Sequence, residues 1–232
     1  MKTAIVTGAS SGIGKKVAAK LLIEGFKVYG CGRDFSDCEL VLNQNFIKVE
    51  CDLRNFALVE QIFGSLKKEC KEIELIINGA GVGYYGPHEQ LNPSKIHELV
   101  SVNLEAPMII SNIFLRELKA NEGTIINISS VTAKKSNTHG CAYGATKAGL
   151  TSFGESLFDE VRKYGVRVIN IHPDMTRTKL YRNADFTYSN ENDESLLADE
   201  VADVVWNCID VRRGAVITDI TIKPQKHAIK RK

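Results

Sequence analysis

Short apolar runs alternate with amphipathic stretches along most of the chain. The runs are rich in β-branched residues, and they predict strands near residues 3–7, 27–31, 46–50, 73–78, 123–129, 166–171 and 215–222. The stretches between them repeat apolar residues at helical spacing, which predicts helices near residues 13–24, 55–70, 95–119, 142–164 and 195–208. Such an alternation is typical of a parallel sheet whose strands are joined by helical crossovers.

The predicted fold class is α/β, with one Rossmann-fold domain over residues 1–225. We expect a doubly wound, seven-stranded parallel sheet flanked by helices on both faces. A chain of 232 residues with 44% hydrophobic content can bury a sizeable core, and no linker or internal repeat divides it. Residues 226–232 are a basic tail, which we expect to be frayed in solvent.

Two polar segments interrupt the alternation, at residues 84–93 and at residues 179–195. Long irregular segments in a compact domain are usually functional loops or disordered.

Charge and cysteine usage narrow the class of protein. The net charge of +2 gives no strong field for nucleic acid or membranes, so neither is expected as a partner. Because no apolar run reaches about 18 residues and the first residues fit a strand, we expect neither a membrane span nor a signal peptide. The six cysteines form no CxxC pair, which favours reduced thiols, no metal site and a cytoplasmic protein.

The first strand is followed directly by a glycine-rich turn, Gly8-Ala-Ser-Ser-Gly12-Ile-Gly14, and then by a helical pattern. Glycines let a ligand approach the backbone, and the free amides at a helix N-terminus favour an anion. The arrangement predicts a site for the pyrophosphate of a dinucleotide.

Tyr143 and Lys147 lie four residues apart on a predicted helix, so their side chains share one face. A cation about 4 Å from a phenol, at an effective dielectric constant near 20, is worth roughly 4 kcal/mol, or about three pKa units. We therefore expect Lys147 to lower the pKa of Tyr143 towards the range useful for proton transfer.

Together these residues resemble the classical short-chain dehydrogenase/reductase family, over nearly the whole chain. Further matching motifs are Cys51-Asp52-Leu53, Asn78-Gly79-Ala80-Gly81, Val102-Asn103-Leu104, Asn127-Ile-Ser-Ser130 and His172-Pro173-Asp174, with Thr178 five residues beyond the proline. The resemblance implies an oxidoreductase that moves a hydride between a nicotinamide and a carbonyl or secondary alcohol of a small substrate. It also places a substrate loop at residues 179–195.

The resemblance implies roles for individual residues. The catalytic set would be Asn103, Ser130, Tyr143 and Lys147, with Ser129 as the alternative to Ser130. Tyr143 would exchange a proton with the substrate oxygen, Ser130 would polarise that oxygen, and Asn103 would hold a water that feeds protons to Lys147. The cofactor would contact Gly8, Ser10, Ser11, Gly12, Ile13, Gly14, Arg33, Asp52, Leu53, Asn78, Ala80, Gly81, Tyr143, Lys147, Pro173 and Thr178.

The end of the second predicted strand bears on the choice of dinucleotide. Gly32 stands where NAD-binding sites usually carry an acid, and Arg33 follows with a planar fork suited to a 2′-phosphate. We therefore expect NADP(H), with NAD(H) as the alternative. Arg33 is alternatively a surface residue paired with Asp34 or Asp37.

Three departures from the family pattern are visible. Gly79 replaces an asparagine that often ties neighbouring strands together, and Asp174 replaces a glycine near the expected nicotinamide site. The family's frequent Asp-Gly-Gly near the last strand is absent. Because that terminus commonly helps tetramers to assemble, a homodimer built on the helices that bear Asn103 and Tyr143 is favoured over a homotetramer.

Two other functions remain open. One is a reductase of 3-oxoacyl thioesters on an acidic carrier, for which a basic surface would be needed; the candidates are Lys134, Lys135, Arg177, Lys179 and Arg182. The other is a non-catalytic regulator that binds a dinucleotide, against which the intact set of catalytic residues argues.

Overall fold

A computed structural model describes residues 1–70, 72–212 and 214–232. Its main sheet has seven parallel strands in the order β3-β2-β1-β4-β5-β6-β8. The first three strands extend from β1 towards one edge of the sheet and the later strands towards the other, so the strand order switches between β1 and β4. These strands are β1 (Thr3–Thr7), β2 (Lys27–Gly32), β3 (Phe46–Glu50), β4 (Ile73–Asn78), β5 (Thr124–Ile128), β6 (Arg167–Pro173) and β8 (Asp219–Ile222). The predicted doubly wound α/β fold is confirmed.

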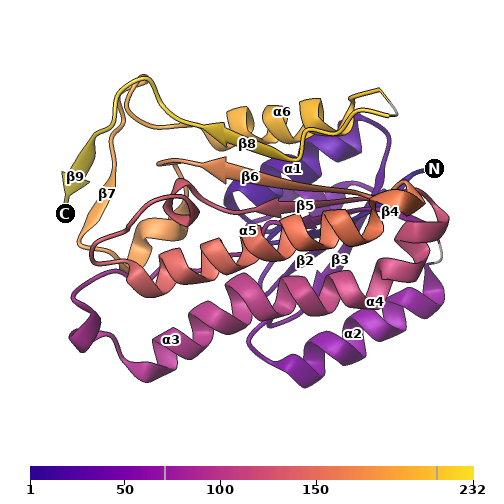
Figure 1. The fold of residues 1–232 in the computed structure, drawn as a ribbon, viewed down its shortest axis with the longest axis horizontal. Helices are drawn as coiled ribbons and strands as arrows, with labels where there is room; N and C mark the ends of the chain where they lie inside the picture. Colours follow the sequence, from indigo (N-terminus) through magenta and orange to yellow (C-terminus); the bar gives the residue numbers. More distant parts are fainter. Residues whose placement is uncertain (71, 213) are drawn as a thin grey trace.

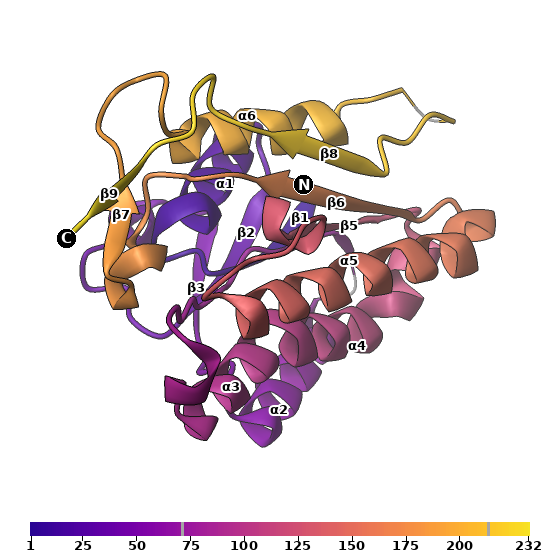
Figure 2. The ribbon, with the colours of Figure 1, turned by 60° about the vertical axis from the view of Figure 1, so that its left-hand side comes forward.

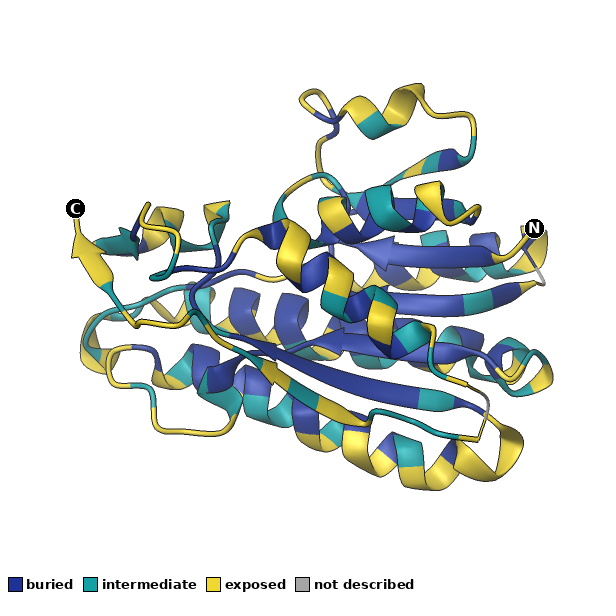
Figure 3. Cartoon of the chain, turned by 90° about the horizontal axis from the view of Figure 1, so that it is seen from above, coloured by how far each residue is buried: buried dark blue, intermediate teal, exposed yellow. Residues whose placement is uncertain are grey.

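Helices cover both faces of the sheet, as Figure 1 shows. One face carries α1 (Gly12–Ile23) and α6 (Ala198–Ile209); the other carries α2 (Phe56–Glu69), α4 (Ala106–Ala120) and α5 (Cys141–Val161), with α3 (Pro93–Val100) beside them. Each face holds one hydrophobic cluster, and the central strands β1, β4, β5 and β6 between the two layers are almost wholly buried (Figure 3). This burial on both faces explains the apolar runs in the sequence.

The long helix predicted at residues 95–119 is interrupted. A π-helical segment, Ser101–Glu105, separates α3 from α4 and contains Asn103. The 28-residue stretch Pro93–Ala120, with a mean hydropathy of 1.3 in its most apolar part, passes a membrane-span test by length and composition. It nevertheless belongs to the core, because Ile110, Phe114 and Leu118 are fully buried in the cluster on the sheet.

The C-terminal tail differs from its prediction. Residues Ile229–Arg231 form β9, which pairs antiparallel with β7 (Phe186–Tyr188) in the predicted substrate loop. Figures 1 and 2 show this two-stranded ribbon at the end of the molecule towards which the main strands point. The expectation of a frayed tail was wrong because β7 offers a free strand edge, and β9 occupies it.

Candidate active site

Two adjoining pockets lie at the carboxyl ends of the strands, between the loops that follow β1 and β4. The inner pocket has a volume of about 140 Å³ and the outer pocket about 110 Å³. They share the walls Gly8, Ser11, Ala80, Gly81 and Arg182. This crevice at the topological switch point is where open α/β sheets bind their ligands.

The glycine-rich turn is built for close approach of an anion. Gly8 and Gly12 have φ angles of 72° and 56°, in the left-handed region that favours glycine. A Cβ on Gly14 would lie 2.4 Å from the carbonyl oxygen of Gly8, so any side chain there would push the turn apart. At the start of α1, Ser11 makes no side-chain cap and the first turn has no acid. The free amides and the dipole therefore fit a pyrophosphate.

The outer pocket gathers the residues predicted to face the adenosine half of a dinucleotide. Its walls include Ser10, Gly32, Arg33, Asp52 and Leu53. Arg33 is exposed, and in the described residues we find no ion pair between it and Asp34 or Asp37; the Asp34 carboxylate accepts from the backbone amide of Ser36 at 2.9 Å instead. The geometry thus leaves the guanidinium of Arg33 available to a phosphate.

Thr7, which the sequence did not single out, explains how the chain accommodates a glycine at position 79. Its hydroxyl accepts hydrogen bonds from the amides of Gly79 and Ala80, both at 3.1 Å. A Cβ on Gly79 would lie 2.8 Å from the carbonyl oxygen of Thr7. The close approach of β1 therefore requires a glycine here, and Thr7 ties the two segments together.

Ser130, Tyr143 and Lys147 all line the inner pocket. Ser130 follows β5, and its hydroxyl oxygen accepts from the amide of Thr132 at 3.2 Å and from its hydroxyl at 3.0 Å. The proton of the Ser130 hydroxyl remains for donation, and Ser130 lies near enough to Tyr143 to lower the pKa of the phenol. Ser129 instead donates to the carbonyl oxygen of Lys147 at 3.1 Å, so its hydroxyl supports α5.

The pKa of Tyr143 differs from the expectation. Burial raises it to about 12, and the hydrogen bond from Ser130 lowers it only in part. The Lys147 ammonium is 6.0 Å from the centre of the Tyr143 ring and donates to the carbonyl of Ile128 at 2.8 Å; burial lowers its own pKa to about 8. The predicted lowering of the Tyr143 pKa by Lys147 was wrong for this structure because loss of solvent outweighs the distant cation.

Asn103 is fully buried behind Gly81. Its side chain accepts from the amide of Val82 at 2.9 Å and donates to the carbonyl of Val82 at 3.0 Å and to the hydroxyl of Thr146 at 3.2 Å. A Cβ on Gly81 would meet both the Asn103 amide oxygen and the Lys147 ammonium, at 3.5 and 3.7 Å. Asn103 therefore lies across Gly81 from Lys147, and the π segment that carries it is a frequent signature of functional sites.

Asn78 lies beneath the pockets and lines neither of them. It begins a ladder of buried amides across three strands, donating to Asn127 at 2.9 Å, which in turn donates to Asn170 at 3.0 Å. The three residues are direct neighbours in the sheet register. The register thus gives the Asn78 side chain a role inside the sheet, against Asn127, and its cofactor contact stays a prediction.

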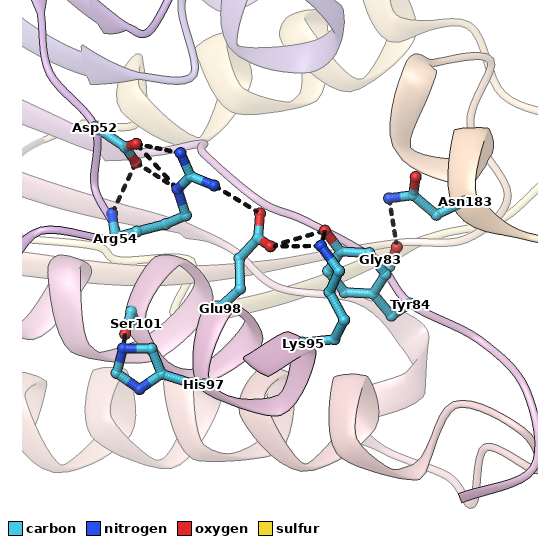
Figure 4. A network of polar contacts seen from close by, with 9 residues as sticks. All are labelled: Asp52, Arg54, Gly83, Tyr84, Lys95, His97, Glu98, Ser101 and Asn183. Carbon is cyan, nitrogen blue, oxygen red and sulfur yellow. Dashed lines mark hydrogen bonds and ion pairs between the residues drawn. The ribbon is translucent and has the colours of Figure 1, made fainter. Parts of the chain in front are cut away.

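A polar network reaches from the outer pocket to the substrate loop (Figure 4). Arg54 donates to Asp52 at 2.9 Å and lies 3.9 Å from Glu98, which accepts from the Tyr84 hydroxyl at 2.8 Å. Burial raises the pKa of Glu98, but bonds from Tyr84 and Lys95 keep it below its usual value. Arg54 also lowers the pKa of Asp52, so both carboxylates stay charged and fixed.

Tyr85 and the aromatic residues of the substrate loop form an aromatic wall beside Tyr143. Tyr85 has its ring centre 5.6 Å from that of Tyr143 and 5.0 Å from that of Phe186, and Tyr181 lies 5.7 Å from Phe186. Of these rings, Tyr143 and Tyr181 line the inner pocket. The sequence reasoning missed Tyr85 and Tyr181, although both lie in the two segments that it marked as irregular.

The remaining predicted cofactor contacts also line the inner pocket; they are Ile13, Pro173 and Thr178. Thr178 caps the 3₁₀ turn Lys179–Asn183 and packs against Gly12, whose Cβ would lie 3.3 Å from the Thr178 methyl group. Asp174 bonds its side chain to the amide of Met175 at 2.9 Å, which shapes the turn after β6. The aspartate that replaces the family's glycine at this position therefore helps to hold the turn.

Comparison with known proteins agrees with this geometry. Serine 3-dehydrogenase of Agrobacterium fabrum is 30% identical over 216 residues, which cover 88% of this chain and 86% of that protein. A metagenomic short-chain oxidoreductase solved in complex with NADP is 28% identical, with a TM-score of 0.80 over 96% of this chain and 97% of that one. The alcohol dehydrogenase of the archaeon Thermococcus sibiricus, at 21% identity, shares the fold with a TM-score of 0.88 over 98% and 99%.

The family assignment rests on a family model that matches more than half of the chain. Residues 2–188 match the protein family described as short chain dehydrogenase, and this range contains the glycine-rich turn as well as Ser130, Tyr143 and Lys147. The resemblance that the motifs indicate is thereby confirmed. The chain belongs to the short-chain dehydrogenase family and is an oxidoreductase.

Proposed function

We propose that this protein catalyses NADP(H)-dependent hydride transfer between the nicotinamide and a carbonyl or secondary alcohol of a small substrate. The observation that carries the proposal is the convergence of Ser130, Tyr143 and Lys147 on one pocket that is continuous with the glycine-rich turn. When bound, the cofactor supplies or accepts the hydride. The residues of the chain bind it, orient the substrate and move the proton.

Each catalytic residue has a distinct task in this proposal. Tyr143, whose pKa is raised to about 12, holds its proton at neutral pH and donates it to the carbonyl oxygen during reduction. The hydroxyl of Ser130 donates to the same oxygen and stabilises its developing charge. Lys147 places a buried cation beside the nicotinamide ribose site, and Asn103 fixes the segment at Gly81 against which both lie.

The cofactor is NADP(H). Arg33 on the rim of the outer pocket, with Gly32 in place of an acid, suits a 2′-phosphate. Ser10, which lies against Gly32, and Ser11 add hydroxyl donors to the same pocket. Lys15 and Lys16 do not compete for this role, because they are paired with Glu39 and Asp199.

A carrier-bound substrate is not favoured by the surface charges. Lys134 is paired with Asp219, and Arg177 donates to Ser195, Asn190 and Glu191 within the loop. Two of the five candidate basic residues are thus engaged within the fold rather than free to bind an acidic carrier. A small, freely diffusing carbonyl compound fits the inner pocket of about 140 Å³ better.

The cellular setting and assembly form part of the proposal. The even charge balance and the free thiols suit a cytoplasmic enzyme. A homodimer would use the outer faces of α4 and α5, where partly buried apolar side chains such as Ile113, Leu115 and Phe158 gather. Light scattering of the purified protein measures the oligomeric state directly.

The test of the function is an oxidation and reduction assay with both cofactors. Purified protein is mixed with NADPH or NADH and a panel of small aldehydes and ketones, and the nicotinamide absorbance is followed at about 340 nm. We expect turnover with NADPH and at least one carbonyl compound. Cofactor binding without turnover across the panel, and across the matching alcohols with NADP⁺, would instead favour the regulator.

A further inference from the structure

A buried histidine and a carboxylate lie behind Ser130, outside the walls of both pockets. His172, at the end of β6, has no exposed surface. Its Nε2 atom lies 2.6 Å from a carboxylate oxygen of Asp219, which comes from the adjacent strand β8. The other oxygen of Asp219 accepts from the ammonium of Lys134. The proposed hydride transfer gives His172 and Asp219 no task.

Both nitrogens of the His172 ring face oxygen acceptors. The Nδ1 atom lies 3.1 Å from the backbone carbonyl oxygen of Ser130, and a carbonyl can only accept a hydrogen bond. The ring therefore donates from Nδ1 to this carbonyl, while its Nε2 atom faces the carboxylate of Asp219. Although burial raises the pKa of Asp219, bonds from Lys134 and His172 keep it below its usual value.

The bond from His172 restrains the peptide group of Ser130. The same carbonyl oxygen also accepts from the amide of Ala133 at 3.0 Å, so two donors fix its direction. The Ser130 hydroxyl is held by two donors from Thr132. With the carbonyl and the hydroxyl lone pairs engaged, the hydroxyl proton is left to donate into the inner pocket, which Tyr143 also lines.

We propose that His172, held by Asp219, is a positioning residue that orients the hydroxyl of Ser130 towards the reacting oxygen. The inference rests on the proposed catalytic role of Ser130. The simpler alternative is that the pair only joins β6 to β8 and stabilises the sheet. The two differ in one respect: a residue that acts through Ser130 has nothing left to orient once the Ser130 hydroxyl is removed.

A double-mutant cycle makes this difference measurable. The variants are His172→Gln, Asp219→Asn and Ser130→Ala, alone and in pairs with Ser130→Ala. We expect His172→Gln to lower kcat about tenfold, the equivalent of one charge-assisted hydrogen bond, and Asp219→Asn to lower it by about three- to tenfold. KM and the NADPH dissociation constant should change less than about twofold. In the Ser130→Ala background, neither substitution should lower kcat by more than about twofold.

Matched controls separate the pair from its surroundings. Lys134→Met removes the outer partner of Asp219 but leaves the bonds of His172, and we expect kcat within about twofold of wild type. Lys135→Met removes a neighbouring exposed charge and should change nothing. The melting temperature of each variant reports the loss of sheet stability. If His172→Gln fails to fold, Asp219→Asn carries the cycle alone, because that position is partly exposed.

The outcomes distinguish the two ideas. Equal losses in the wild-type and Ser130→Ala backgrounds overturn the positioning role and leave a structural pair. Unchanged turnover in Ser130→Ala itself contradicts the proposed function, because Ser130 would then not act on the substrate. Coupled losses confined to kcat support both.

Discussion

The glycine-rich turn and the substrate loop form opposite walls of one pocket, yet they are built in different ways. The turn is local in its main course: β1, Gly8–Gly14 and α1 follow one another in the chain, and Gly14 lies against the carbonyl of Gly8. The substrate loop is held from a distance, because β7 pairs with β9 some forty residues later and the Lys232 ammonium donates to the carbonyls of Tyr181 and Ala184 at 2.7 and 3.0 Å.

This difference assigns separate tasks to the two walls. The turn binds the part of the cofactor that is the same for every reaction, so a rigid, local structure suits it. The loop and tail face the substrate, and their few long-range hydrogen bonds can be altered without unfolding the sheet. The catalytic residues Ser130 and Tyr143 lie where the walls meet.

The largest effect is expected at that junction. Tyr143→Phe removes the proton donor while keeping the ring, and we expect a loss in kcat of about 10²- to 10⁴-fold. NADPH affinity belongs to the opposite wall and should change little, because the loss acts only in the transition state. Single-turnover kinetics and cofactor titration measure the two quantities.

Tyr85→Phe provides the control for that substitution. It removes the hydroxyl of a ring that packs on Tyr143 without lining the inner pocket, and it should retain most of the turnover. Near-normal turnover of Tyr143→Phe would refute the assignment of the proton donor.

The contrast between local and long-range contacts also explains which features could be predicted from the sequence. The strands, the glycine-rich turn and the Ser130, Tyr143 and Lys147 set were predictable, because they depend on local spacing and on motifs. The π segment at Asn103 was not, since its hydrogen bonds to Val82 are tertiary and leave no periodic signal. The β7–β9 pairing and the bond between His172 and Asp219 likewise join distant positions, and neither leaves a pattern in one chain.

The second largest effect tests the cofactor wall. A 2′-phosphate held by Arg33 gains a charge-assisted contact worth roughly 1.5–3 kcal/mol. Arg33→Ala should therefore raise the NADPH dissociation constant about ten- to a hundredfold and move that of NADH by less than about threefold. Direct titration of both cofactors at one ionic strength is required, because salt weakens the contact.

Gly32→Asp combined with Arg33→Ala sharpens the test of the cofactor wall. The added carboxylate repels the phosphate and offers an acceptor to the ribose of NADH, so the preference should move further towards NADH. Equal weakening of both cofactors by Arg33→Ala would mean that Arg33 is a surface residue.

A smaller effect is expected on the substrate wall. Lys232→Met removes the ammonium that holds the carbonyls of Tyr181 and Ala184, while Lys230→Met changes an exposed side chain on β9, two residues earlier. Loss of about two hydrogen bonds should raise KM for the carbonyl substrate by up to about tenfold, with NADPH affinity unchanged. Lys230→Met should behave as wild type. A rise in the NADPH dissociation constant of Lys232→Met would show that the walls are not independent.

The smallest expected effect is a change in the stability of the fold when Lys147 is replaced, and this change depends on pH. Burial lowers the pKa of Lys147 from 10.5 to about 8, so at neutral pH the folded protein holds a charge that burial penalises. Lys147→Met should remove that penalty and stabilise the fold at pH 7 by about 1 kcal/mol, or about 2–4 °C in melting temperature, while it weakens turnover and NADPH binding.

Between about pH 8 and 10.5 the unfolded chain binds more protons than the folded one, so wild-type stability rises and the advantage of the variant disappears. Melting curves at several pH values, with Lys135→Met as the exposed control, measure this; a difference that stays constant with pH would show that Lys147 is not charged at a cost in the folded protein.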